Sequence, residues 1–171
     1  MIVVLAIDGL ELKKVEEYNC EHLKQKFFGK TNIDEYEEPR TMVLWSSFST
    51  GENKESEVLI DGKQEMWDKQ WPRGETFYTN FKSPVVIDLP GYSYEQESHQ
   101  KSRELLKNFF TTKDEEEKTK IREEYNKDAF DHHRSVKEQF EAALKEDHDF
   151  VLGYFSLADV IGHLNFRNNL L

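Results

Sequence analysis

The sequence contains a single cysteine, Cys20, among its 171 residues. An intrachain disulfide is therefore impossible, and no set of thiolates exists that could bind a metal. No apolar run approaches the ~20 residues that a membrane-spanning helix needs. The first ten residues, MIVVLAIDGL, also lack the basic start and the small-residue cleavage site of a signal peptide. These absences predict a cytoplasmic protein with no membrane partner.

Basic residues are outnumbered, with 23 lysines and arginines against 34 aspartates and glutamates. The formal net charge of -11 repels phosphate backbones and argues against a nucleic-acid polymer as the partner. The aromatic share of 13% argues against disorder, because disordered chains lack such anchors. The length suits one domain with a real core, and no internal repeat or low-complexity tract is present.

Three apolar, β-branched or aromatic runs predict buried strands: IVVLAI at 2–7, the start of SPVVIDLPGYSY at 83–94, and DFVLGYFS at 149–156. Between them, apolar spacing predicts helices over 11–28, closed by Gly29, and over 41–50, with Thr41 as N-cap and Gly51 as the stop. Two long helices follow, over about 95–110 and 114–145, and a last helix begins at LADVIGHLNF. Within 52–83, EVLIDGK suggests a short strand and turn, and EMWDKQW a short helix.

Strands separated by helices predict an α/β fold with helices on both faces of the sheet. In such sheets ligands bind beyond the carboxyl ends of the strands, where Asp8 and Asp159 are expected. Asp159 and His163 are four residues apart, so on a helix they share a face and could chelate one ion. Thr41 begins a helix whose N-terminal N–H groups suit a phosphoryl oxygen.

The order of these segments resembles the alkaline phosphatase superfamily, in particular its type I phosphodiesterase/nucleotide pyrophosphatase branch. VVLAIDGL looks like the opening strand with the first metal-binding aspartate, and PRTMVLWSSFSTG like the nucleophile segment with Thr41 at the nucleophile position. VVIDLPGYSY is similar to the second strand of the family, and LADVIGH to its Asp-x-x-Gly-His ligand pair.

The resemblance implies a three-layer αβα fold with a mixed, mostly parallel central sheet. It also implies a single domain over 1–171, with insert or cap segments at about 52–83 and 92–148. The implied activity is hydrolysis of a small phosphate ester with Thr41 as nucleophile. Two divalent metal ions, zinc or manganese, would be held by Asp8 and Thr41 and by Asp159 and His163.

The sequence also departs from the family. A later strand ending in an Asp-His pair, and one more distant histidine, complete the metal sites of the family but do not occur before Leu171. Each metal would keep only two protein ligands, whereas catalytic zinc sites normally hold three. We therefore expect weak metal binding and little or no turnover in this form. The unfinished sheet would also leave an edge strand, which a homodimer could cover.

Other interpretations stay open at this stage. The chain could be a non-catalytic α/β domain that keeps the fold and binds a metal or an anion. A haloacid-dehalogenase-type phosphatase would need an acidic residue two positions after Asp8, where Leu10 stands. His132, in FDHHRSV, is interpreted as part of a solvated helix face together with Asp128, and His99 is assigned no role.

Overall fold

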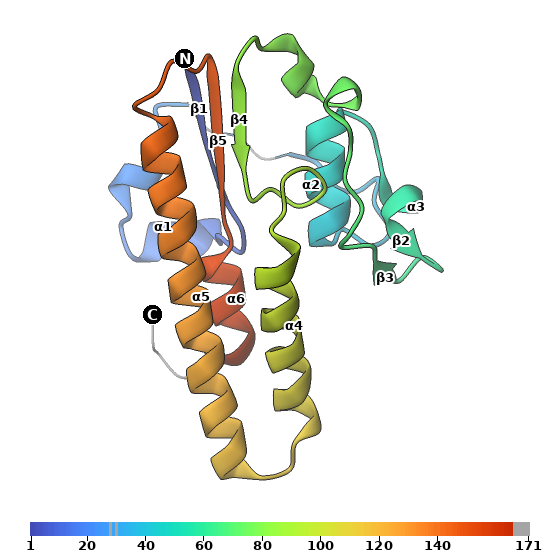
Figure 1. The fold of residues 1–171 in the computed structure, drawn as a ribbon, viewed down its shortest axis with the longest axis vertical. Helices are drawn as coiled ribbons and strands as arrows, with labels where there is room; N and C mark the ends of the chain where they lie inside the picture. Colours follow the sequence, from blue (N-terminus) through green and yellow to red (C-terminus); the bar gives the residue numbers. More distant parts are fainter. Residues whose placement is uncertain (28, 30, 166–171) are drawn as a thin grey trace.

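The computed structural model describes residues 1–27, 29 and 31–165, and shows an α/β fold built on a three-stranded parallel sheet (Figure 1). The strands are β1 (Ile2–Ile7), β2 (Leu59–Ile60), β3 (Gln64–Glu65), β4 (Pro84–Ile87) and β5 (Phe150–Phe155). The α-helices are α1 (Leu12–Glu17), α2 (Thr41–Thr50), α3 (Glu55–Val58), α4 (Gln96–Thr111), α5 (Glu115–Ala143) and α6 (Leu157–Asn165). Three 3-10 turns are η1 (Glu21–Leu23), η2 (Arg73–Glu75) and η3 (Phe77–Asn80).

The main sheet has the order β1-β5-β4, with β5 in the centre and all three described strands parallel. These are the three strands that the apolar runs predict. The connections between parallel strands contain the helices, as such crossovers require. A separate two-stranded antiparallel sheet pairs β2 with β3 around the turn at Asp61 and Gly62, which confirms the predicted short strand and turn.

The two faces of the main sheet bury different side chains, because successive residues of a strand point to opposite sides. On one face Val151 of β5 packs against Val136 and Phe140 of α5. Gly153 leaves room for this helix, since a Cβ there would lie 2.6 Å from the Phe140 ring. The other face carries a largely aromatic cluster, which comprises Phe150, Leu152 and Tyr154 together with Trp45 of α2, Tyr78 of η3, Leu89 and Tyr94.

The limits of the long helices follow from local signals. Gly51 ends α2 in the left-handed conformation at φ 75°, as the sequence predicts. Asp114 caps α5, because its Oδ1 accepts hydrogen bonds from the N–H groups of Glu116 at 2.8 Å and Glu117 at 3.1 Å. The prediction for Thr41 was wrong by one residue: Arg40 is the N-cap and Thr41 is the first helical residue.

Two other helix predictions were wrong. The segment 11–28 is helical only over α1 and the short η1, because Asn19 takes a positive φ of 48° and breaks the helix. Phe27 is 82% exposed, so the apolar spacing there does not mark a buried face; Phe28, at the predicted end, lies outside the described residues. The segment 65–71 is not helical, because Glu65 ends β3 and 66–71 forms a turn and irregular chain, in which Trp71 packs with Met42 and Val58.

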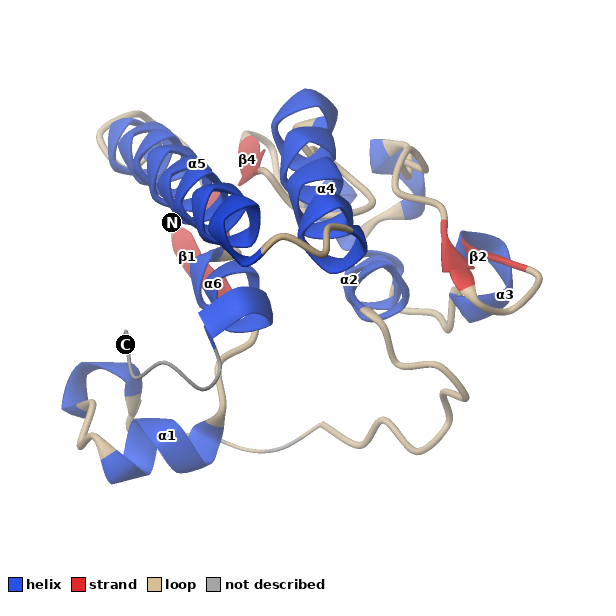
Figure 2. Cartoon of the chain, turned by 90° about the horizontal axis from the view of Figure 1, so that it is seen from below, coloured by secondary structure: helices blue, strands red, loops and turns tan. Residues whose placement is uncertain are grey.

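The helices α4 and α5 pack against each other and extend past the ends of the strands (Figure 1). Seen from below, they lie as neighbours on one side of the molecule, whereas the α1 segment lies on the opposite side (Figure 2). The carboxyl ends of the three strands lie at the end of the sheet from which α4 and α5 extend (Figure 1). Residues that follow the strands are the natural place to look for a site.

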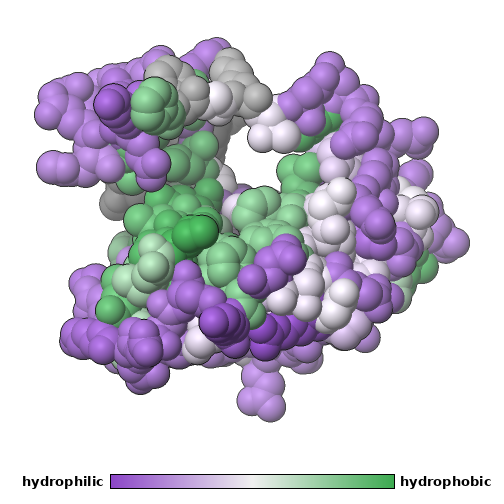
Figure 3. All heavy atoms as spheres, turned by 90° about the horizontal axis from the view of Figure 1, so that it is seen from above, coloured by the Kyte–Doolittle hydropathy of each residue, from purple (hydrophilic) through white to green (hydrophobic). Residues whose placement is uncertain are grey.

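The predicted burial of β1 was wrong, because this strand lies at the edge of the sheet and is incompletely covered. Val3 and Leu5, which lie in register with Val151 and Gly153, are exposed at 45% and 57%. Figure 3 shows an apolar area on the upper face, surrounded by mainly hydrophilic surface. Within the described part of the chain, no helix is both long and apolar enough to cross a membrane.

Candidate functional site

Each of the three parallel strands is followed by an aspartate. Asp8 comes directly after β1, Asp88 directly after β4, and Asp159 lies in the first turn of α6, which follows β5. Because parallel strands end at the same edge of the sheet, these carboxyl groups are displayed along one edge. Asp8 and Asp159 were predicted to be site residues, whereas Asp88 was not.

Asp8 and Asp159 lie beside each other. Gly9, with φ at 66°, brings the end of β1 so close to α6 that a Cβ on this glycine would lie 2.7 Å from the Asp159 Cα. The half-buried Asp8 carboxylate accepts hydrogen bonds from Tyr154 Oη at 2.5 Å and from Gly9 N–H at 3.1 Å. Burial raises the pKa of Asp8, the Tyr154 bond lowers it, and the charge of Asp159 raises it again.

Asp159 and His163 share one face of α6, as their spacing predicts. His163 Nε2 lies 3.2 Å from Asp159 Oδ2, with side chains exposed at 49% and 36% respectively. The hydrogen bond to Asp159 raises the pKa of His163, and the more distant charge of Asp8 adds to this effect. Two carboxylates and one imidazole therefore lie in one neighbourhood, and these are donor types that zinc and manganese accept.

The helix α2 borders the same neighbourhood. Its residue Trp45 packs edge-on against Tyr154, with ring centroids 5.4 Å apart, and its side chain lowers the pKa of Asp8. Thr41 is half-buried at the first position of this helix. The next N–H group, that of Met42, donates to Glu65 Oε1 at 2.8 Å, so one helix-terminal N–H already holds a carboxyl group.

Burial raises the pKa of Glu65, whereas the Met42 N–H and the charge of Arg40 lower it. The charge of Asp8 raises the pKa of Glu65 by a smaller amount than burial does. The start of α2 therefore lies within the electrostatic reach of the Asp8 group. Asp8, Asp159 and His163 lie together at one end of the sheet, whereas no hydrogen bond or ion pair joins Thr41 to them among the described residues.

A different set of three residues brings its potential metal ligands closer together. Among the residues that the structure describes, only Asp88, His99 and His132 bring three metal-ligating atoms within 4.8 Å of one another. Asp8, Asp159 and His163 do not bring three such atoms this close together. The donor chemistry of the predicted site fits a divalent metal, but its ligand atoms are less closely gathered than those around Asp88.

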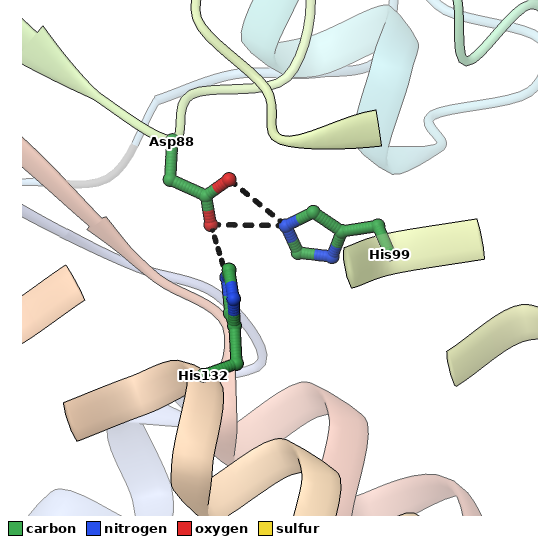
Figure 4. A group of neighbouring side chains, drawn as sticks. All are labelled: Asp88, His99 and His132. Atoms are coloured by element: carbon green, nitrogen blue, oxygen red, sulfur yellow. Dashed lines mark hydrogen bonds and ion pairs between the residues drawn. The ribbon is translucent and has the colours of Figure 1, made fainter. Parts of the chain in front are cut away.

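The Asp88 cluster joins three elements (Figure 4). Asp88 follows β4 and is fully buried, His99 lies in the first turn of α4, and His132 lies near the middle of α5. His99 Nε2 donates to both carboxylate oxygens of Asp88, at 3.0 Å and 2.9 Å. His132 Nε2 donates to Oδ2 of the same carboxylate at 2.6 Å.

This geometry corrects two predictions. His132 was expected on a solvated helix face, yet its side chain is only 12% exposed and is bonded to Asp88. His99 was assigned no role, yet its side chain is 6% exposed. The signal that could have found them is Asp88 itself, since it follows an apolar strand in the same way as Asp8.

The Asp88 carboxylate and the histidines of the cluster stabilise each other's charged forms. Burial alone would raise the pKa of Asp88, but the hydrogen bonds from His132 and His99 together hold it below its ordinary value. Burial alone would lower the pKa of His132, but the Asp88 carboxylate outweighs it and the pKa lies above its ordinary value. Asp88 is therefore ionised at neutral pH, and both imidazoles point to a buried negative charge.

Comparisons of the chain with protein-family models, with curated proteins and with solved structures found no significant match. The resemblance drawn from the four sequence motifs therefore stays a prediction, and the functional argument depends on the residues described above.

Proposed function

We propose that this protein is a metal-dependent phosphoesterase with Thr41 as its nucleophile and with divalent metal ions bound by Asp8, Thr41, Asp159 and His163. The observation that carries the proposal is the placement of Asp8, Asp159 and His163 together at the carboxyl edge of a parallel sheet, with α2 beside them. Zinc is the metal we favour and manganese the alternative, because carboxylate and imidazole donors serve both.

The electrostatics of the edge favour a cation. Burial and the charge of Asp159 both raise the pKa of Asp8, so the ionised form of this carboxyl group is destabilised. A divalent cation between these groups would remove that cost. Tyr154 and Gly9 each occupy one oxygen of Asp8, and each oxygen keeps a further lone pair for a metal.

The start of α2 supplies the second part of the proposal. Thr41 is the first residue of a ten-residue helix, whose N-terminus carries partial positive charge and attracts oxyanions. A bound metal would lower the pKa of the Thr41 hydroxyl and polarise the phosphoryl group. Thr41 is half-buried, so its side chain is partly accessible to a small substrate.

The reaction would proceed in two displacements at phosphorus. Thr41 Oγ1 loses its proton to solvent and attacks, an O–P bond forms, and the ester O–P bond breaks as the alcohol leaves and takes up a proton. Water then attacks the phosphothreonine, releases phosphate or a phosphate monoester, and restores Thr41 when its oxygen is protonated again. Asp8, Asp159 and His163 would bind the metal ions during both displacements.

Several wider features belong to the same proposal. The fold would be a three-layer αβα core over 1–171, with 52–83 and 92–148 as inserted segments. The protein would act in the cytoplasm on a small phosphate ester. The exposed β1 side chains Val3 and Leu5 would support a homodimer formed across this edge strand.

A second candidate is a non-catalytic domain that binds a metal or an anion at the same edge without turnover. The observation that favours it is that Asp8, Asp159 and His163 do not gather their ligand atoms within the 4.8 Å found for the Asp88 cluster. This candidate predicts ligand binding without hydrolysis.

Steady-state hydrolysis separates the two candidates. The full chain is freed of metal, supplied with Zn²⁺ or Mn²⁺, and assayed with bis-p-nitrophenyl phosphate and p-nitrophenyl phosphate. Because each metal would keep only two protein ligands, we expect slow metal-dependent release of nitrophenolate, which falls to the uncatalysed rate in Thr41→Ala and is partly kept in Thr41→Ser, which retains the hydroxyl. Thr119→Ala, an exposed threonine of α5, is the matched control. Metal-dependent hydrolysis that survives in Thr41→Ala would overturn the role of Thr41, and metal binding without hydrolysis would favour the second candidate.

A further inference from the structure

We propose that Asp88, His99 and His132 bind one divalent transition-metal ion, for which Zn²⁺ is the best match. None of these residues belongs to the four that the proposed phosphoesterase uses. The inference therefore stands whether or not the protein hydrolyses phosphate esters.

The donor set matches known zinc chemistry. Zinc binds imidazole nitrogens at about 2.0–2.1 Å and carboxylate oxygens at about 2.0–2.2 Å, and open sites with three protein ligands keep a fourth position for water. In a tetrahedral site such ligand atoms would lie about 3.3 Å apart. The two Nε2 atoms now lie 2.9 Å and 2.6 Å from Asp88 Oδ2. Opening these contacts by roughly half an ångström would admit the ion.

The site is buried and its ligands are held in position. His99 is fixed by Tyr94, whose ring stacks on the imidazole with centroids 3.7 Å apart and an interplanar angle of 10°. The backbone of Asp88 has a φ of 57°, and its Oδ1 also accepts the Glu95 N–H at 3.0 Å. His132 is carried by the long helix α5, which packs against both the sheet and α4. Ligands held in this way lose little conformational freedom when a metal binds.

The local charge suits a cation. A metal would bind Nε2 of neutral imidazoles that carry their proton on Nδ1, so only Asp88 would be charged and the three ligands would leave one positive charge on the site. Glu95 and Asp128 lie close enough to raise the pKa of His132, and they would offset this charge. Lys101 Nζ binds Asp128 at 2.8 Å and reduces the contribution of that residue.

The alternative to metal binding is a purely structural role for these three residues. As a network of hydrogen bonds, they could simply link β4, α4 and α5 without any metal. Glutamine separates these two roles, because its side-chain N–H₂ can donate to Asp88 as the imidazole does but does not replace an imidazole as a zinc ligand. The variants His99→Gln and His132→Gln therefore keep the link and remove one metal ligand each.

The experiment measures Zn²⁺ affinity and stoichiometry on the full chain after removal of metal, by competition with a chromogenic chelator. The matched control is His163→Gln, which removes a histidine of the proposed phosphoesterase site. We expect each of the variants His99→Gln and His132→Gln to lose one bound ion, with an affinity at that site at least about 100-fold lower, since even the loss of a group that only supports a ligand costs about 10–100-fold. His163→Gln is expected to keep this ion.

Three results would overturn the inference: no zinc bound by the wild-type chain, unchanged binding in both glutamine variants, or an ion lost only in His163→Gln. The last result would leave the proposed phosphoesterase site standing, so the two proposals fail separately. Unfolding curves recorded without metal show whether each variant is folded.

A measurement on the wild-type chain covers the case in which a variant does not fold. In ¹⁵N-histidine-labelled protein, Zn²⁺ is expected to shift the Nε2 resonances of two imidazoles that are hydrogen-bonded in the metal-free state. Absence of any such shift at saturating Zn²⁺ would contradict the site.

Discussion

Tyr154 Oη and Asp8 Oδ2 form a hydrogen bond of 2.5 Å that joins the central strand β5 to the end of the edge strand β1. Tyr154 is buried and Asp8 is half-buried, so water competes weakly for this bond. The bond stabilises the ionised carboxylate and lowers the pKa of Asp8 against the opposing effect of burial. The proposed metal ligand at position 8 is thus oriented by a residue of the sheet core.

Replacement of Tyr154 by phenylalanine should therefore destabilise the fold and raise the pKa of Asp8 further. Loss of a hydrogen bond to a charged group should lower the free energy of unfolding at neutral pH by about 1–3 kcal/mol. Denaturant unfolding measures the first effect, and a ¹³C carboxyl titration of Asp8 measures the second. Tyr18→Phe is the control, because Tyr18 is 65% exposed. Equal stability of the two variants would show that the bond contributes nothing.

Gly9 and Gly62 allow a matched test of the contact between β1 and α6. Both have a positive φ, 66° and 68° respectively, but a Cβ on Gly9 would meet Asp159 Cα at 2.7 Å, whereas a Cβ on Gly62 would meet no atom within 4 Å. Gly62→Ala should cost only the backbone strain of about 1–2 kcal/mol. Gly9→Ala should cost clearly more, because the backbone of Asp159 has to move.

Denaturant unfolding of these two alanine variants gives the comparison. The displaced Asp159 should also weaken metal binding at the proposed phosphoesterase site in Gly9→Ala and not in Gly62→Ala. Similar losses of stability for the two variants would mean that β1 and α6 do not approach as closely as described.

Glu65 should make stability depend on pH. Burial is the main cause that raises its pKa above the ordinary 4.5, so the folded chain holds the proton more tightly than the unfolded chain. The stability that this proton contributes is complete below pH 4.5 and is lost as the pH rises through the folded pKa. Glu65→Gln keeps an oxygen acceptor for the Met42 N–H and has no proton to lose.

The glutamine variant should therefore gain stability relative to the wild type as the pH rises above about 4.5, and should be the more stable of the two at pH 7. Unfolding free energies measured between pH 4 and 8 test this. Glu35→Gln is the control, because it removes the same charge at an exposed position. A wild-type curve parallel to that of Glu65→Gln over this range would contradict the prediction.

Much of the fold could be predicted from local sequence. The apolar runs gave β1, β4 and β5, and the signals at Gly51 and Asp114 mark the ends of real helices. The segment after β1 was not predictable in the same way, because the left-handed turn at Asn19 interrupts a spacing that suits a longer helix. Local patterns do not show such a turn.

One candidate site could be predicted from local sequence and the other could not. Asp8 and Asp159 could be placed because each follows a strand, and Asp159 and His163 because they lie on one helix. The Asp88 cluster could not be assembled, because His99 and His132 come from different helices and meet only when α4 packs on α5. On α5 alone, the charged neighbours of His132 are typical of a solvated face.

The most direct test of the proposed function is detection of phosphate on Thr41. The full chain, loaded with Zn²⁺, is mixed with bis-p-nitrophenyl phosphate, quenched in acid at short times, and examined by peptide mass spectrometry. The proposal predicts a phosphoryl adduct on Thr41 that forms with the first nitrophenolate released and is absent in Thr41→Ala. Metal-dependent nitrophenolate release with no adduct on Thr41, or with the adduct on another residue, would contradict it.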